Sequence, residues 1–186
     1  MLYMAADFGP LDRAEIVTDL ERARVEFHRL LAEAERHDAW ANPTNGTRWT
    51  NEQLLFHMVF GYMVVQRLLV LVRVLGRLPV PVSRLYARVL DAATRPFHAV
   101  NYYGSCGAAL VYNRRRMGAK LDRVIASLRS KLVQESDDAL RRGMHFPPRW
   151  DPFFTDYMTL ADVYRYPGRH FDFHARQLTC NRAFGE

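Results

Sequence analysis

One long apolar segment limits the folds open to this chain of 186 residues. The segment LLFHMVFGYMVVQRLLVLVRVLG covers residues 54–76 and is long enough to cross a bilayer. It is interrupted by four polar residues, which are His57, Gln66, Arg67 and Arg73. Each charge near the middle of a bilayer would cost roughly 2.5–3.5 kcal/mol. We therefore expect a helix buried inside a helical protein, and a membrane span is the lesser alternative.

The composition predicts a single globular domain over residues 1–186. The chain is 49% hydrophobic and 25% charged, which is typical of a folded domain rather than a disordered chain. No repeat, low-complexity tract or change in composition marks a second domain. The net charge of +6 predicts weak attraction to anions, but no DNA-reading motif accompanies it, so we expect no nucleic-acid partner.

The cysteines and the N-terminal segment predict a cytoplasmic protein. Two cysteines, Cys106 and Cys180, are too few for a disulfide framework in a chain of this length. Three acidic residues, Asp7, Asp12 and Glu15, interrupt the first twenty residues, so we expect no secretory signal.

Apolar spacing and capping residues predict helices on both sides of the central segment. A first helix is expected from about Asp12 to His37, because its apolar residues recur every three or four positions. After the turn-rich ANPTNGT, residues 41–47, a second helix should begin at Thr50, where Gln53 completes a capping box, and reach about Gly76.

The sequence also predicts helices between residues 83 and 140. We expect LPVPVS, residues 78–83, to be a connector and a third helix to run from about Ser83 to Tyr103 with an interruption near Pro96. GSCG, residues 104–107, predicts a break, and a fourth helix should cover about Ala109 to Leu140.

PPRWDPFF, residues 147–154, predicts a loop held by prolines and aromatic residues. The last helix should begin near Met158, with Thr159 and Asp162 as its capping pair. Pro167 must either kink this helix or restart it with Tyr166 as the boundary. No alternating strands appear, so the predicted fold is an all-α four-helix bundle with extra short helices or loop segments in the middle.

Two histidines near the end of the chain are the first candidate metal ligands. His170 and His174 are four positions apart in RHFDFHARQL, so a helix places both on one face. Such a pair alone is weak evidence, because metal sites that do chemistry usually have three protein ligands. His57 is a good third candidate, since it lies on the most apolar helix, where an unpaired polar group is costly.

These motifs resemble those of the DinB-like superfamily. Trp49–Thr50 followed by His57 is similar to that family's W[ST]…H element, and His170, His174, Gln177 and Leu178 are similar to its final-helix motif. The resemblance covers about thirty residues, and residues 78–150 contribute nothing to it. It implies a four-helix bundle in which His57, His170 and His174 hold a divalent metal ion, with zinc, nickel and iron all acceptable to three imidazoles.

Two further residues are predicted to line the site and bind its cofactor. Gln177 is expected to orient a ligand or bind a group on the metal, although a surface amide is nearly as good an interpretation. Tyr166, one turn before His170, is expected to present its phenol to the same cavity, with core packing as the equal alternative. No general base can be assigned, because the directions of Glu52 and Asp162 are not set by the sequence.

Two classes of function remain open at this point. The resemblance implies a metal-dependent enzyme that binds a small-molecule substrate together with a low-molecular-weight thiol such as mycothiol or bacillithiol, in S-transfer or isomerisation. Hydrolysis by a water on the metal is the nearest competitor. The other class is non-catalytic: the metal would hold together a helical protein that acts as a stress-response or interaction module. In that class the apolar residues 60–75 would supply a homodimer face.

Overall fold

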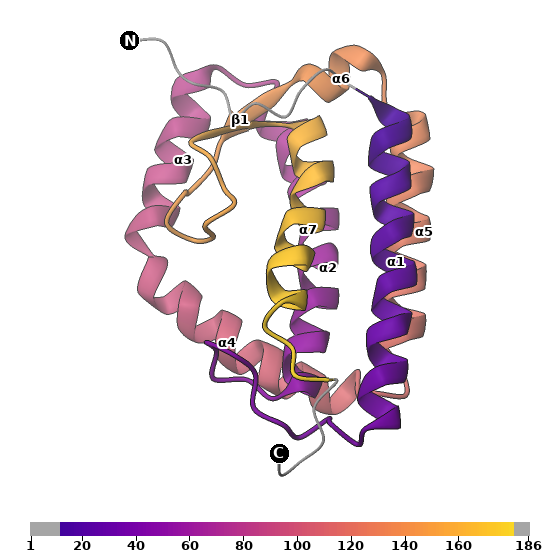
Figure 1. The fold of residues 1–186 in the computed structure, drawn as a ribbon. Coiled ribbons are helices and arrows are strands. Elements are labelled where there is room, and N and C mark those ends of the chain that lie inside the picture. Colours follow the sequence, from indigo (N-terminus) through magenta and orange to yellow (C-terminus); the bar gives the residue numbers. More distant parts are fainter. Residues whose placement is uncertain (1–11, 181–186) are drawn as a thin grey trace.

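The protein is mostly helical, as the sequence predicted. The structure, a computed structural model, describes residues 12–180. Within that range the helices are α1 (Arg13–Arg36), α2 (Asn51–Leu75), α3 (Val80–Ala92), α4 (Thr94–Val111), α5 (Met117–Gln134), α6 (Asp137–Arg141) and α7 (Leu160–Ala175) (Figure 1). Two short strands, β1 (Gly143–His145) and β2 (Tyr157–Thr159), lie between α6 and α7. The expected single domain covers residues 1–186 and so extends beyond the described residues. Asp7, one of the acidic residues that argued against a secretory signal, also lies outside them.

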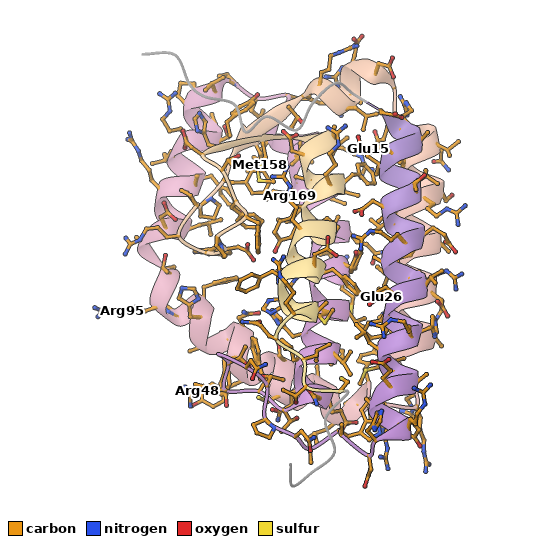
Figure 2. All side chains as sticks on the ribbon, in the orientation of Figure 1. Glu15, Glu26, Arg48, Arg95, Met158 and Arg169 are labelled. Carbon is orange, nitrogen blue, oxygen red and sulfur yellow. The ribbon has the colours of Figure 1, made fainter. Side chains whose placement is uncertain are left out.

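Helix α1 packs its apolar stripe against α5 and α7 (Figure 1). Asp12 caps the helix by accepting hydrogen bonds from the backbone N–H groups of Ala14 and Glu15. The stripe predicted from the sequence is buried at Ile16, Leu20, Ala23, Phe27, Leu30 and Ala34. Charged side chains such as Glu26 lie on other faces of the helix (Figure 2).

Helix α2 lies at the centre and contacts α4, α5 and α7. The predicted capping box is present: the Thr50 hydroxyl accepts from the N–H of Gln53, and the Gln53 side chain accepts from the N–H of Thr50. Helix α2 is long and apolar enough to cross a membrane, but the core helix of a soluble protein can have the same length and composition. Its buried side chains contact helices of the same chain and form the main core with them.

The middle of the chain differs most from the sequence prediction. Helix α3 begins three residues before the expected Ser83, and Pro81 is tolerated because it lies in the first turn, where no backbone N–H is needed. The predicted break at residues 104–107 is wrong, since α4 runs through it to Val111. The predicted fourth helix is shorter than expected at both ends, because residues 112–116 and 135–136 separate α5 from α4 and α6.

A small antiparallel hairpin precedes α7. β1 pairs with β2 in the register Met144 opposite Met158, and both of these side chains are fully buried. The sequence predicted no strand here; the structure has two, and His145 lies in β1 and is buried. The predicted loop at residues 147–154 is confirmed and connects the two strands.

Helix α7 is one helix from Leu160 to Ala175, so Pro167 does not create a boundary at Tyr166. The Thr159–Asp162 capping box is confirmed, although the helix begins two residues after Met158. Pro167 and Gly168 are both buried, and a Cβ at Gly168 would lie 2.0 Å from Oδ2 of Asp19 on α1. Small residues at this point therefore let α1 and α7 approach closely.

Candidate metal centre

Helices α2 and α7 bring the three candidate histidines together. The ring centroids are 5.1 Å apart for His57 and His170, 4.9 Å for His57 and His174, and 4.5 Å for His170 and His174. One nitrogen from each ring lies within 4.8 Å of the other two, and all three residues are buried. The group can therefore hold a metal ion, and binding itself stays a prediction.

Hydrogen bonds at Nδ1 leave Nε2 available on two of these rings. Nδ1 of His174 lies 2.7 Å from Oε1 of Gln177, and Nδ1 of His57 lies 3.1 Å from the hydroxyl of Ser105. An amide oxygen can only accept, so the Nδ1 of His174 carries the proton and its Nε2 keeps a lone pair. Partners at the second ring nitrogen are what fixes histidine ligands in metal sites.

The third ring is held by a close contact with α2. Nδ1 of His170 is buried without a hydrogen-bond partner, and a Cβ at Gly61 would lie only 2.9 Å from it. Glycine at position 61 therefore makes room for the ring. Nε2 of His170 lies on the other side of the ring, 3.9 Å from Oδ2 of Asp151.

Burial keeps the three imidazoles neutral. Desolvation and the nearby His174 lower the pKa of His57 from 6.5 to about 3. Desolvation also lowers the pKa of His170 far below its ordinary value, and that of His174 less strongly, since the bond to Gln177 opposes it. Neutral imidazole is the form that binds metal ions, so the site needs no deprotonation step near neutral pH.

Aromatic rings surround the three histidines. Trp49 stacks on His57 with ring centroids 4.4 Å apart. Tyr102 in turn stacks on Trp49, with ring centroids 5.8 Å apart. Phe173 contacts His174 edge-on at 5.2 Å. These walls exclude water from the rings and favour electrostatic interactions inside the site.

Tyr166 reaches the site through Asp151. Its ring lies 5.7 Å from that of His170, and its hydroxyl donates to Oδ2 of Asp151 at 2.8 Å. The backbone N–H of Phe153 donates to the other oxygen of the same carboxylate. Burial raises the pKa of Asp151 despite these two bonds.

Sequence reasoning missed Asp151 and Ser105. Asp151 lies in the loop between the strands, 19 positions before His170, so no helical spacing connects it to the histidines. Ser105 was placed in a break rather than in α4, although it is 99% buried. The only signal in the sequence was a lone carboxylate among the aromatic residues of WDPFF.

The remaining candidates have other partners. Glu52 accepts a hydrogen bond from the backbone N–H of Arg114, and Asp162 caps α7. Asp172, which lies between the two histidines in sequence, pairs with Arg22 on the surface. His145 lies 3.0 Å from Asp156, outside the group of three histidines.

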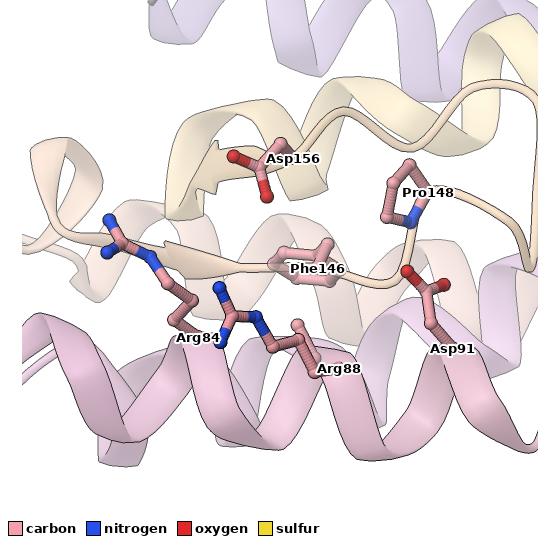
Figure 3. A pocket seen from close by; sticks show the side chains of 7 residues that line it. Arg84, Arg88, Asp91, Phe146, Pro148 and Asp156 are labelled. Carbon is pink, nitrogen blue, oxygen red and sulfur yellow. The ribbon is translucent and has the colours of Figure 1, made fainter.

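A pocket of about 220 Å³ lies elsewhere, between α3 and the segment that follows β1 (Figure 3). Its polar lining comes from Arg84, Arg88, Asp91 and Asp156. The two positive and two negative side chains favour neither an anion nor a cation, so we assign no ligand to it.

Comparisons with known proteins identified no relative of this chain. No family model, curated protein or solved structure matches this chain.

Removing the amide that holds His174 should weaken metal binding. Gln177→Leu keeps the approximate size of the side chain but leaves Nδ1 of His174 without an acceptor, so we expect the affinity for zinc to fall by roughly 10–100-fold. Competition with a chromophoric chelator measures this. Gln134→Leu, at the exposed end of α5, is the matched control and should bind as the wild type does. Equal affinity for both variants would remove Gln177 from the site.

Proposed function

We propose that this chain is a DinB-like metalloprotein that binds one divalent ion through His57, His170 and His174. The observation that carries the proposal is the convergence of three buried, neutral imidazoles from two segments more than 100 residues apart. In this proposal α1, α2, α5 and α7 are the four helices of the bundle, and α3 and α4 are additions to it. The mutual packing of α1 with α5 and α7, and of α2 with α5 and α7, supports that assignment.

The donor set fits a divalent ion. Two rings already have their Nδ1 atoms engaged, and the buried Nδ1 of His170 shows that this ring is not placed for a hydrogen bond within the protein. Three imidazoles accept zinc, nickel or iron, and affinity alone does not choose among them. Three ligands leave at least one coordination position for another molecule.

We further propose an enzyme that acts on a small molecule together with a low-molecular-weight thiol. A divalent ion in this site would lower the pKa of a thiol or water that binds to it. The chain itself supplies a carboxylate beside the site, Oδ2 of Asp151, which can hold a proton because burial raises the pKa of this group. Tyr166 orients that carboxylate, and Trp49 shields the rings from water.

Hydrolysis would use the same residues, with Asp151 accepting a proton from water instead of from a thiol. A structural role is the alternative from a different class: a metal that holds α2 to α7 would also use these three histidines. The half-buried carboxylate of Asp151 favours chemistry over a structural role, because a site that only joins helices gains nothing from a partly desolvated acid. A cytoplasmic location and the absence of nucleic-acid and membrane partners belong to the same proposal.

A thermal-shift screen with metal ions and small thiols tests the proposal. An ion at 100 times its dissociation constant stabilises a protein by about 2.7 kcal/mol, which should raise the melting temperature by roughly 5–10 °C. A thiol should give a further increase only in the presence of the ion. Stabilisation by the ion with no response to any thiol would favour hydrolysis or the structural role, and no response to any ion would contradict the metal site.

Asp151→Asn should separate chemistry from metal binding. The amide keeps the shape of the side chain and can still accept from Tyr166, so we expect an unchanged metal content. The proton-accepting oxygen is lost, and turnover of a substrate found by the screen should fall by roughly 100-fold or more. Asp172→Asn, on the exposed side of the same region, is the control and should retain full turnover. Loss of metal in the Asp151 variant would instead make this carboxylate a ligand.

A further inference from the structure

The outer face of α4 is apolar and lacks charge. Val100, Tyr103 and Leu110 are 71%, 68% and 82% exposed. Residues 96–111 contain no Asp, Glu, Lys or Arg, although 25% of the whole chain is charged. Arg95, at the start of this helix, projects away from the body of the protein (Figure 2). Contiguous apolar surface of this kind marks an interaction site, whereas isolated apolar residues do not.

Two glycines on α4 have no explanation within a single chain. A Cβ added at Gly104 or at Gly107 would meet no atom within 4 Å. Glycine is disfavoured in a helix interior relative to alanine, so open space alone gives no reason for it here. The close approach of another helix does give one, because glycine lets two backbones come near each other.

The large and small residues of this face are arranged symmetrically. Val100, Tyr103, Gly107 and Leu110, which we call the α4 stripe, are separated by three, four and three positions. This is the spacing of a helix–helix seam. Its midpoint is position 105, so an antiparallel copy related by a twofold axis would place Tyr103 opposite Gly107 and Val100 opposite Leu110. Each large ring would then face the partner's smallest residue.

We propose that the α4 stripe is the interface of a homodimer in which two copies of α4 pack antiparallel around a twofold axis. A twofold interface must be complementary to itself, and the pairing of Tyr103 with Gly107 meets that condition. The proposal does not rest on the metal site. The α4 stripe lies on the face of α4 opposite Ser105, whose hydroxyl contacts His57.

The exposed apolar area of α4 supplies a large part of what a dimer of ordinary size needs. Val111, which follows Leu110 at the end of α4, is 56% exposed as well. Together with the α4 stripe, this side chain exposes roughly 250–400 Å² of apolar surface, taking roughly 60–120 Å² for an aliphatic and 150–250 Å² for an aromatic side chain. A standard interface needs about 800 Å² per partner, of which about 56–65% is apolar.

The stripe is also a better dimer face than residues 60–75 of α2. Val65, Leu69 and Val72 of that segment are buried in the core of the same chain. Among the apolar side chains of that segment, only Val70 and Val74 are more than half exposed, whereas α4 has four such side chains, which are Val100, Tyr103, Leu110 and Val111.

Sedimentation velocity over a wide concentration range tests the proposal on the full chain. The mass of the wild type should rise from 21.7 kDa towards twice that value as the concentration increases. Leu110→Glu and Gly107→Val should both remain at 21.7 kDa. Val133→Glu, which places the same charge on an exposed valine of α5, is the matched control and should dimerise as the wild type does.

The two α4 variants should prevent dimerisation for different physical reasons. Leu110→Glu buries a charge, while Gly107→Val adds no charge and only fills the space for Tyr103 of the other copy. If Leu110→Glu does not fold, Gly107→Val decides alone, because its side chain meets nothing in the single chain. A wild type that stays monomeric, or a dimer that survives both variants, would overturn the proposal. So would a monomer that binds phosphatidylserine vesicles and loses that binding in Leu110→Glu, since the face would then belong to a membrane surface.

Discussion

His170→Leu is expected to abolish metal binding without destabilising the metal-free protein. The variant removes one of three ligands, so the affinity should fall by at least roughly a thousandfold, more than the 10–100-fold typical for residues that only support a ligand. The ring it replaces is fully buried and its Nδ1 has no hydrogen-bond partner. Replacing an unsatisfied buried polar group with an apolar one of similar size costs little or stabilises. The free energy of unfolding of the metal-free variant should therefore stay within about 1 kcal/mol of the wild type, or exceed it.

Elemental analysis and urea unfolding measure the two parts of this prediction. His57→Leu and His174→Leu should lose the metal in the same way. His28→Leu is the matched control, because His28 is exposed on α1, pairs with Asp122 and does not belong to the group of three histidines. A His170 variant that is strongly destabilised without metal would show that the ring is part of the core rather than a ligand held ready for an ion.

The stability of the metal-free protein should decrease as the pH falls below about 6.5. The unfolded chain protonates its histidines near that pH, whereas burial lowers the pKa of His57 to about 3 and also lowers those of His170 and His174. The unfolded state then binds more protons than the folded state, so acid favours unfolding. Each histidine contributes up to about 1.4 kcal/mol per pH unit in this window.

Asp151 should act in the opposite direction at lower pH. Burial raises its pKa, so the folded protein takes up this proton before the unfolded chain does. The resulting stabilisation is fully present below the pKa of the unfolded chain, near 3.8, and is lost as the pH rises through the folded value. The slope due to the histidines should therefore be clearest between pH 6.5 and 5.

Urea unfolding at several pH values measures the slope. The wild type should lose stability steeply from pH 6.5 downwards, and a variant with all three histidines replaced by leucine should lose most of that dependence. Bound zinc should steepen the loss further, because protons compete with the metal for the same nitrogens. An equal slope in the wild type and in the triple variant would contradict the assignment of these histidines as buried and neutral.

Local signals in the sequence predicted the ends of the helices that carry the site. The capping boxes at Thr50 and Thr159 use side chains and backbone groups only three positions apart, so they can be recognised without knowing the fold. The four-residue spacing of His170 and His174 is local as well. Proximity of His57 to this pair was inferred from its apolar helix and from the family resemblance, and the structure confirms that the three rings lie together.

The rest of the site depends on contacts that are distant in sequence. Ser105 reaches His57 only because α4 packs on α2 across 48 positions, and glycines 104 and 107 made this segment look like a break. Helix propensity is a weak preference that packing overrides. Asp151 is positioned by the loop between two three-residue strands, which are too short to show the alternation that marks a strand in sequence.

X-ray absorption spectroscopy of the zinc-loaded protein tests the central claim most directly, because it reports the atoms that bind the ion. We predict three imidazole nitrogens at about 2.0–2.1 Å, with the remaining position taken by a light atom such as oxygen. Adding a small thiol should replace that atom with sulfur at about 2.3 Å while the three imidazoles remain. A zinc ion with fewer than three imidazoles, or with sulfur from Cys106 or Cys180 in the absence of added thiol, would contradict the account.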